Sequence, residues 1–279
     1  MAPLPVPLNL ASDCSSCAGL CCVALPFQRS REFPVDKAAE EPCGNLAVDA
    51  RCQIHEKLRP AGWIGCTEFE CFGAGQRVTQ QLFDGATWRE NPSIAGPMFA
   101  AFRVLQPVHE ILFYLSQALA IPLPGKLTAE VQELEARLRS AAGQDAAALA
   151  GLDVGAARAA VGPLLAQVSA VVRDRARAEG RAPAQLPAHL RARAELMGRN
   201  LTRVDLRGAD LRGALLIGAR LDEASLDSTD LLGADLRDAS VRGTDLGNAL
   251  FLTQPQVNSA RGDLRTRLPH GLSRPGHWT

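Results

Sequence analysis

Residues 201–250 read LTRVDLRGAD LRGALLIGAR LDEASLDSTD LLGADLRDAS VRGTDLGNAL, with an aliphatic residue at every fifth position. A period of five suits neither regular structure. It turns an α-helix by about 140° beyond a full turn, and it puts successive leucines on opposite faces of a strand. If the chain instead turns a corner after each pentapeptide, every leucine points toward the axis of a coil, and the stretch predicts a solenoid. The leucine column consists of Leu201, Leu206, Leu211, Leu216, Leu221, Leu226, Leu231, Leu236, Val241 and Leu246.

The positions around each leucine carry small and turn-forming residues. Alanine stands two residues before most of the leucines, where Thr229 and Thr244 are exceptions. Asp is frequent directly before the leucine and Gly two residues after it, and both residue types favour tight turns. The pattern is clearest in ADLRG at 209–213 and GADLRD at 233–238.

This A(D/N)LxG pattern resembles the pentapeptide repeat proteins over residues 199–253. The resemblance implies a right-handed quadrilateral β-helix with four pentapeptides per coil. Because a solenoid needs covered ends, we expect an N-terminal capping helix that begins at Pro187 and ends at Gly198. A capping box of Thr253 and Gln256 predicts a C-terminal capping helix, and the tail after it is expected to lie over the surface or to be mobile.

All eight cysteines lie within the first 71 residues, beginning with CSSCAGLCC at 14–22. A CxxC pair suits one tetrahedral metal, so the eight thiols could form two sites of four ligands each, holding zinc or an iron–sulfur cluster. Adjacent residues of an extended chain point to opposite sides, so we expect Cys21 and Cys22 to belong to different sites. The predicted metal ligands are Cys14, Cys17, Cys21, Cys22, Cys43, Cys52, Cys66 and Cys71.

A disulfide framework or unpaired structural thiols are the alternatives, but the N-terminus lacks the pattern of a secretory signal, which disfavours disulfides. The cysteine spacing also resembles the family described as zinc- or iron-chelating, which opens with CxxCxxCC and continues as in CGNLAVDARCQIHEKLRP at 43–60. Here one extra residue follows Cys17 before the Cys21 pair, Cys66 comes late, and His55 replaces an aromatic residue. These departures leave the ligand pairing open, and His55 could be a further ligand or a half-buried ring.

The middle of the chain is predicted to be helical. The stretch IAGPMFAAFRVLQPVHEILFYLSQALA predicts a helix with a buried apolar stripe, kinked or divided at Pro107. Residues 126–197 are rich in alanine, and two helices are expected there. The first begins near Thr128 and ends at Gly143, and the second is expected to break at Gly162–Pro163.

The sequence therefore predicts a multidomain protein. Its expected parts are a cysteine-rich metal-binding module at 1–92, an α-helical region with the N-terminal cap at 93–198, the β-helix at 199–253, and a capping helix with a tail at 254–279. Thirty basic and thirty acidic residues balance, which argues against a dedicated nucleic-acid binder. Without a visible signal peptide or membrane span, we expect a cytoplasmic protein with no membrane partner.

Three patterns could indicate catalysis, and each has a simpler structural interpretation. His55 could activate a cysteine, but a thiol in so dense a cluster is better explained as a ligand. His109 beside Glu110 on the apolar helix is expected to be a core histidine. GAGQR at 73–77 lacks both the P-loop lysine and the GxGxxG spacing, so it predicts a turn. No catalytic residue is therefore expected.

Composition and motifs favour a non-catalytic metal-binding scaffold or adaptor that uses its solenoid for protein–protein interaction. A redox- or metal-responsive regulatory protein is the alternative. The antibiotic-resistance branch of the pentapeptide repeat family implies a third hypothesis, a DNA mimic that binds a type II topoisomerase. Nine acidic side chains against seven arginines in residues 199–253 weigh against this mimicry, because a duplex carries about one negative charge per 1.7 Å.

Overall fold

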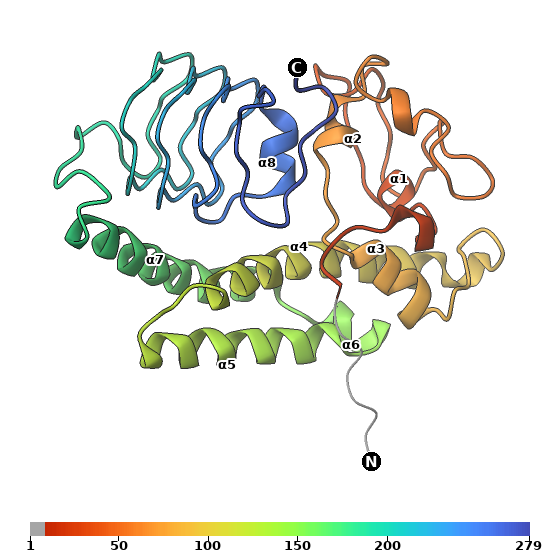
Figure 1. Cartoon of the computed structure of the whole chain (residues 1–279). Coiled ribbons are helices and arrows are strands. Elements are labelled where there is room, and N and C mark those ends of the chain that lie inside the picture. Colours follow the sequence, from red (N-terminus) through yellow and green to blue (C-terminus); the bar gives the residue numbers. More distant parts are fainter. Residues whose placement is uncertain (1–8) are drawn as a thin grey trace. The chain divides into compact units, whose positions relative to one another are not determined.

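The structure is a computed structural model that describes residues 9–279 (Figure 1). The chain forms two compact units, of which the first ends at Leu164 and the second begins at Leu165. The helical segments are η1 (Cys14–Ser16), α1 (Leu20–Ala24), η2 (His55–Lys57), α2 (Ile64–Glu68), α3 (Ala74–Gln76), a π-helix (Arg77–Leu82), η4 (Pro92–Ile94), α4 (Ala95–Leu119), α5 (Gly125–Ala142), α6 (Ala146–Ala150), α7 (Val154–Ala178) and α8 (Gln254–Ser259).

Helices α4 and α5 pack side by side in the first unit (Figure 1). The predicted apolar stripe of α4 is buried, but the helix continues through Pro107 instead of dividing there. Loss of a helical hydrogen bond at proline costs about 3 kcal/mol, and burial on both sides of it offsets that cost. Phe102 before the proline and Leu112 after it are both fully buried. Helix α5 ends before Gly143 as predicted.

The predicted break at Gly162–Pro163 is wrong, because α7 is continuous through both residues. Val161 on one side and Leu165 and Val168 on the other are buried, so packing holds the helix together across the proline. By length and composition α7 could also cross a membrane, which the sequence reading did not identify. One such helix is weak evidence, because a core helix passes the same test.

Residues 200–251 form the predicted solenoid, with four pentapeptides in each coil. Parallel bridges join residues twenty positions apart, such as Asn200 with Arg220 and Arg220 with Ser240. These bridges are isolated, so each coil of the described chain is built from short corners rather than long strands. Every leucine of the column points inward and is buried. The predicted register is therefore confirmed.

The other repeat positions have the structural roles that their residue types suggest. Gly208, two residues after its leucine, has φ +66°, and Arg203 adopts φ +59° at the equivalent place in another coil. The Oδ1 atom of Asp205 accepts the N–H of Arg207 at 3.2 Å, which closes the turn. Thr229 replaces the small alanine, and its buried hydroxyl donates to the carbonyl of Leu206 at 2.7 Å.

The predicted N-terminal capping helix is wrong. Residues 187–198 form turns, and the solenoid register already includes Leu196, which is buried five residues before Leu201. Glu195 bridges Leu215 in the next coil, and Gly198 takes the left-handed turn with φ +64°. The solenoid therefore begins before residue 199.

At the other end, α8 has the predicted capping box of Thr253 and Gln256. The tail after it does not lie loosely over the surface, as the sequence reading expected. Arg267 continues the parallel ladder by bridging Asp245, and the indole N–H of buried Trp278 donates to the carbonyl of Ala260 at 3.0 Å. The tail thus extends and closes the solenoid.

Candidate metal centre

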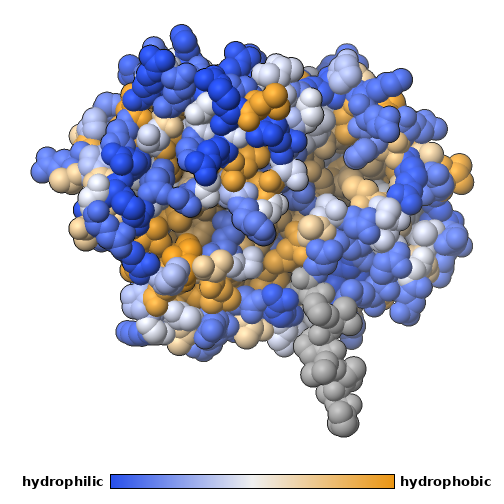
Figure 2. Space-filling model, viewed as in Figure 1, coloured by the Kyte–Doolittle hydropathy of each residue, from blue (hydrophilic) through white to orange (hydrophobic). Residues whose placement is uncertain are grey.

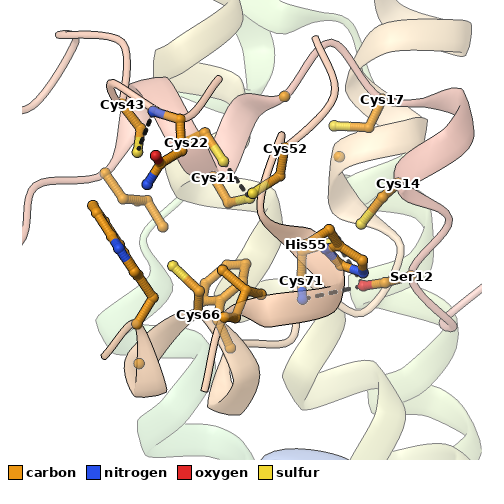
Figure 3. Close-up of a pocket in the computed structure, with 18 of the residues that line it drawn as sticks. Ser12, Cys14, Cys17, Cys21, Cys22, Cys43, Cys52, His55, Cys66 and Cys71 are labelled. Atoms are coloured by element: carbon orange, nitrogen blue, oxygen red, sulfur yellow. Dashed lines mark hydrogen bonds between the residues drawn. The ribbon is translucent and has the colours of Figure 1, made fainter. Parts of the chain in front are cut away.

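All eight cysteines line one cavity of about 470 Å³ in the first unit. They come from η1, α1, α2 and the loops between and after these segments, and all eight are free thiols. Figure 3 shows the labelled side chains around the shared space, together with Ser12 and His55. The fold therefore brings together every residue that the sequence predicts as a ligand.

The first wall of the cavity is built by η1 and α1. Asp13 caps η1 by accepting the N–H of Ser15 at 2.9 Å, and the hydroxyls and N–H groups of η1 lower the pKa of its carboxyl. Gly19 precedes α1 with φ +72°, where a Cβ would lie 2.8 Å from a methyl of Leu46. Only glycine suits both the left-handed conformation and this close approach.

Helix α1 places Cys21 and Cys22 beside each other. The assumption of an extended chain at this pair is wrong, because consecutive side chains of a helix differ by about 100° in direction. Their sulfur atoms lie 3.9 Å apart. A hydrogen bond between them raises the pKa of the Cys21 thiol and lowers the pKa of the Cys22 thiol, so the pair holds one proton more readily than two or none.

The second wall contains Cys17 and Cys71. The GAGQR stretch, predicted as a turn, instead opens α3 and continues into the π-helix. A Cβ on Gly75 would lie 2.7 Å from the sulfur of Cys17 and 3.7 Å from that of Cys71. This glycine therefore lets both thiols approach the α3 backbone closely. The sulfur of Cys71 also lies 2.9 Å from the hydroxyl oxygen of Ser12.

The third wall is an apolar cluster that includes four of the cysteines, Cys22, Cys43, Cys52 and Cys66. Phe27 and Phe33 stack with ring centroids 4.5 Å apart, and Trp63 meets Phe27 edge-on at 5.5 Å. The N–H of Cys43 donates to the carbonyl of Cys22 at 2.9 Å, which ties the loop to α1. Aromatic packing thus positions thiols that are far apart in the sequence.

The cavity walls desolvate the thiols. Burial raises the pKa of Cys17 to about 11 and, with a smaller effect of neighbouring cysteines, that of Cys66 to about 12. A bare thiolate is therefore costly in this cavity. In the described residues 9–279, no three Cys, His, Asp or Glu side chains already stand in ligand geometry, so the thiols must rotate inward to share a cation.

Lys37 is a residue that sequence reasoning missed. Its Nζ atom is buried and donates to the carbonyls of Val23, Ala38 and Glu41 at 3.2, 3.0 and 2.9 Å. Burial lowers the pKa of this ammonium, and the nearby cysteines, Cys43 foremost, oppose that change. A lone lysine between cysteines carries no motif, so only the folded chain shows this cation beside the thiols.

The two histidines of interest differ in environment. His55 is exposed and lines the cavity. His109 is fully buried, with Nδ1 2.8 Å from the carbonyl oxygen of Phe72. Burial lowers the pKa of His109 to about 4, so the ring is neutral at pH 7. It therefore has the core position expected from the sequence.

Comparison with known proteins supports the fold of the second unit. Eight copies of the family model for pentapeptide repeats match residues 200–238 and 214–251. The chain is also 44% identical over 270 residues to the uncharacterized protein YybG of Bacillus subtilis (strain 168), which covers 97% of this chain and 95% of that protein. The chain belongs to the pentapeptide repeat proteins.

Two solved pentapeptide repeat structures resemble this member of the family. Rfr23 from the cyanobacterium Cyanothece 51142 is 29% identical, with a TM-score of 0.26, and the match covers 28% of this chain and 52% of that one. The protein alr5209 from Nostoc Pcc 7120 is 36% identical, with a TM-score of 0.22, and the match covers 29% of this chain and 75% of that one. The resemblance of the cysteine-rich segment to a metal-chelating family stays a prediction.

Proposed function

We propose that the protein is a non-catalytic metal-binding scaffold, with zinc or an iron–sulfur cluster held by its eight cysteines and a solenoid that binds a protein partner. The observation that carries the proposal is the convergence of every cysteine, from Cys14 to Cys71, on one cavity. Thiols scattered for packing alone would have no reason to share one wall-to-wall space. The domain limits, the absence of a catalytic role and the cytoplasmic location remain part of this proposal.

The donor set fits a soft metal. Thiolate ligands suit zinc and iron–sulfur clusters, whereas calcium and magnesium take oxygen ligands. A divalent cation would compensate the thiolate charge that the apolar cluster around Trp63 otherwise disfavours. The ammonium of Lys37 would offset part of the remaining negative charge.

The solenoid supplies the surface of the scaffold. Its outward positions carry Asp–Arg pairs, and Figure 2 shows hydrophilic residues over most of its visible face. Stacked coils present a rigid, extended surface of the kind that other repeat proteins use to bind partners. A polar surface of this kind favours a protein partner with complementary charges.

Metal content is the first test of the proposal. Protein purified without oxygen is expected to contain about two metal centres, each bound by four thiolates. Elemental analysis combined with thiol titration measures both the metal and the accessible cysteines. A preparation without zinc or iron and with eight titratable thiols would contradict metal binding.

A metal- or redox-responsive regulator is the second candidate. It is favoured by the exposure of Cys14, which gives solvent oxidants and chelators direct access to one ligand. A labile, coloured centre that bleaches in air with parallel loss of partner binding would support this regulatory role. A colourless, chelator-resistant zinc protein would support the scaffold.

DNA mimicry is expected to fail in a supercoiling assay with purified gyrase. The acidic groups of the solenoid are largely compensated, since Asp205 pairs with Arg207 at 2.7 Å and Asp235 pairs with Arg237 at 2.7 Å. We expect no inhibition at micromolar protein. Inhibition that is abolished by reversing the charge of exposed Asp245, in Asp245→Arg, would instead favour mimicry.

A further inference from the structure

The eight thiols divide into two neighbourhoods, and one lies in the aromatic wall. Cys22, Cys43, Cys52 and Cys66 belong to the apolar cluster of Trp63, and the other four cysteines do not. Backbone contacts reinforce this grouping, because Cys43 is bonded to Cys22. Of the other cysteines, Cys22, Cys43 and Cys52 are the ones that raise the pKa of Cys66 further, after burial.

The second neighbourhood surrounds Gly75. The sulfurs of Cys17 and Cys71 both lie within 4 Å of the position where a Cβ of Gly75 would stand. Cys14 belongs to η1 and leads directly to Cys17. After burial, Cys71 is the neighbour that most raises the pKa of the Cys14 thiol.

Cys21 is the remaining thiol. It is adjacent to Cys22 in α1, with the two sulfurs 3.9 Å apart, yet it is not part of the aromatic cluster. Apart from Cys22, the thiols whose charge acts on it are Cys17 and Cys14. A tetrahedral thiolate site needs four ligands, and Cys21 is the fourth near Gly75.

We propose that the cavity holds two four-thiolate metal centres, an aromatic-side centre bound by Cys22, Cys43, Cys52 and Cys66 and a glycine-side centre bound by Cys14, Cys17, Cys21 and Cys71. This pairing rests on the proposed metal-binding function. Helix α1 contributes one ligand to each centre, so the two centres are neighbours joined through one turn of helix. Lys37 belongs beside the aromatic-side centre, because Cys43 and Cys22 are its foremost thiol neighbours.

The pairing can be measured on the unaltered protein with ¹¹³Cd as the bound metal. We expect two ¹¹³Cd resonances, each correlated through bonds with the Hβ protons of four cysteines. One resonance should correlate with Cys43 and Cys66, and the other with Cys17 and Cys71. Correlations of one cadmium with Cys17 and Cys43 together would overturn the pairing, while failure of the protein to bind cadmium would overturn metal binding itself.

Paired substitutions give an independent measurement. Cys43→Ser combined with Cys66→Ser removes two ligands of one centre, so bound Co²⁺ should fall by half. Cys17→Ser combined with Cys43→Ser removes one ligand of each centre, so bound Co²⁺ should fall nearly to zero. Equal losses in the two double variants would contradict the pairing. Ser16→Ala, on η1 between the cysteines, is the matched control and should retain both ions.

Discussion

Replacing Leu221 by alanine is expected to lower the free energy of unfolding of the solenoid by about 2–5 kcal/mol. The side chain is fully buried, and the column residues of the neighbouring coils are Leu201 and Val241. The backbone around it is also constrained, since its N–H donates to Ser240 at 2.7 Å and its carbonyl accepts the hydroxyl of Thr244. A cavity at this place cannot close without moving several coils.

Arg220→Ala is the matched control for this change. The side chain of Arg220 is 63% exposed and lies 4.0 Å from the carboxylate of Asp222, so its removal should cost less than about 0.5 kcal/mol. Urea unfolding followed by circular dichroism measures both variants. Equal destabilisation by the two would show that the register is wrong. Asp222 itself is no control, because its half-buried carboxylate accepts the N–H of Arg242.

Asp230→Asn is expected to stabilise the protein at neutral pH. The carboxyl of Asp230 is fully buried, and burial raises its pKa from 3.8 to about 6, although Ser169, the N–H of Leu232 and Arg212 act in the opposite direction. The folded state therefore holds the proton more tightly than the unfolded state, and ionisation costs stability. A difference of about two pKa units corresponds to about 3 kcal/mol at pH 7.

The sign of the pH dependence distinguishes this effect from simple repacking. The advantage of the Asn variant should be small below pH 3.8, grow between 3.8 and about 6, and stay constant above that. Asp235→Asn is the control with opposite sign: although burial raises the pKa of Asp235, its bonds with Arg237 lower it further. That change should therefore weaken the protein at pH 7. A stabilising effect at both positions would contradict the assigned pKa directions.

Much of the solenoid could be predicted because its pattern is local and repeated. Its beginning was misplaced because Leu190, Ala194 and Met197 also fit the spacing of a helix. The decisive residue, Leu196, fits the five-residue period but follows Glu195 instead of Asp. Two periods share these residues, and only packing against the next coil selects one of them.

The prolines show where local preference yields to packing. Pro107 and Pro163 each predict a helix boundary, but both helices continue because apolar side chains are buried before and after the ring. Burying one large aliphatic side chain contributes about 1.5–3 kcal/mol, which is comparable with the cost of an internal proline. The sequence shows that cost but not the long-range burial that offsets it.

The candidate site was predictable in composition but not in arrangement. Eight clustered cysteines indicate ligands without structure. The division between Cys21 and Cys22 depends on a short helix behind Gly19, and the approach of Cys17 to Cys71 depends on Gly75. Both features join segments far apart in the sequence, so spacing alone could not reveal them.

The coil length of twenty residues also restricts how the chain can change in length. Inserting one whole coil would leave every later residue on the face it already occupies, with the stack taller by one layer. Inserting a single pentapeptide would rotate everything after it by a quarter turn and carry α8 and the Trp278 contact to a different side. Viable length variants of this solenoid should therefore differ by multiples of twenty residues, so that its size can change only in discrete steps.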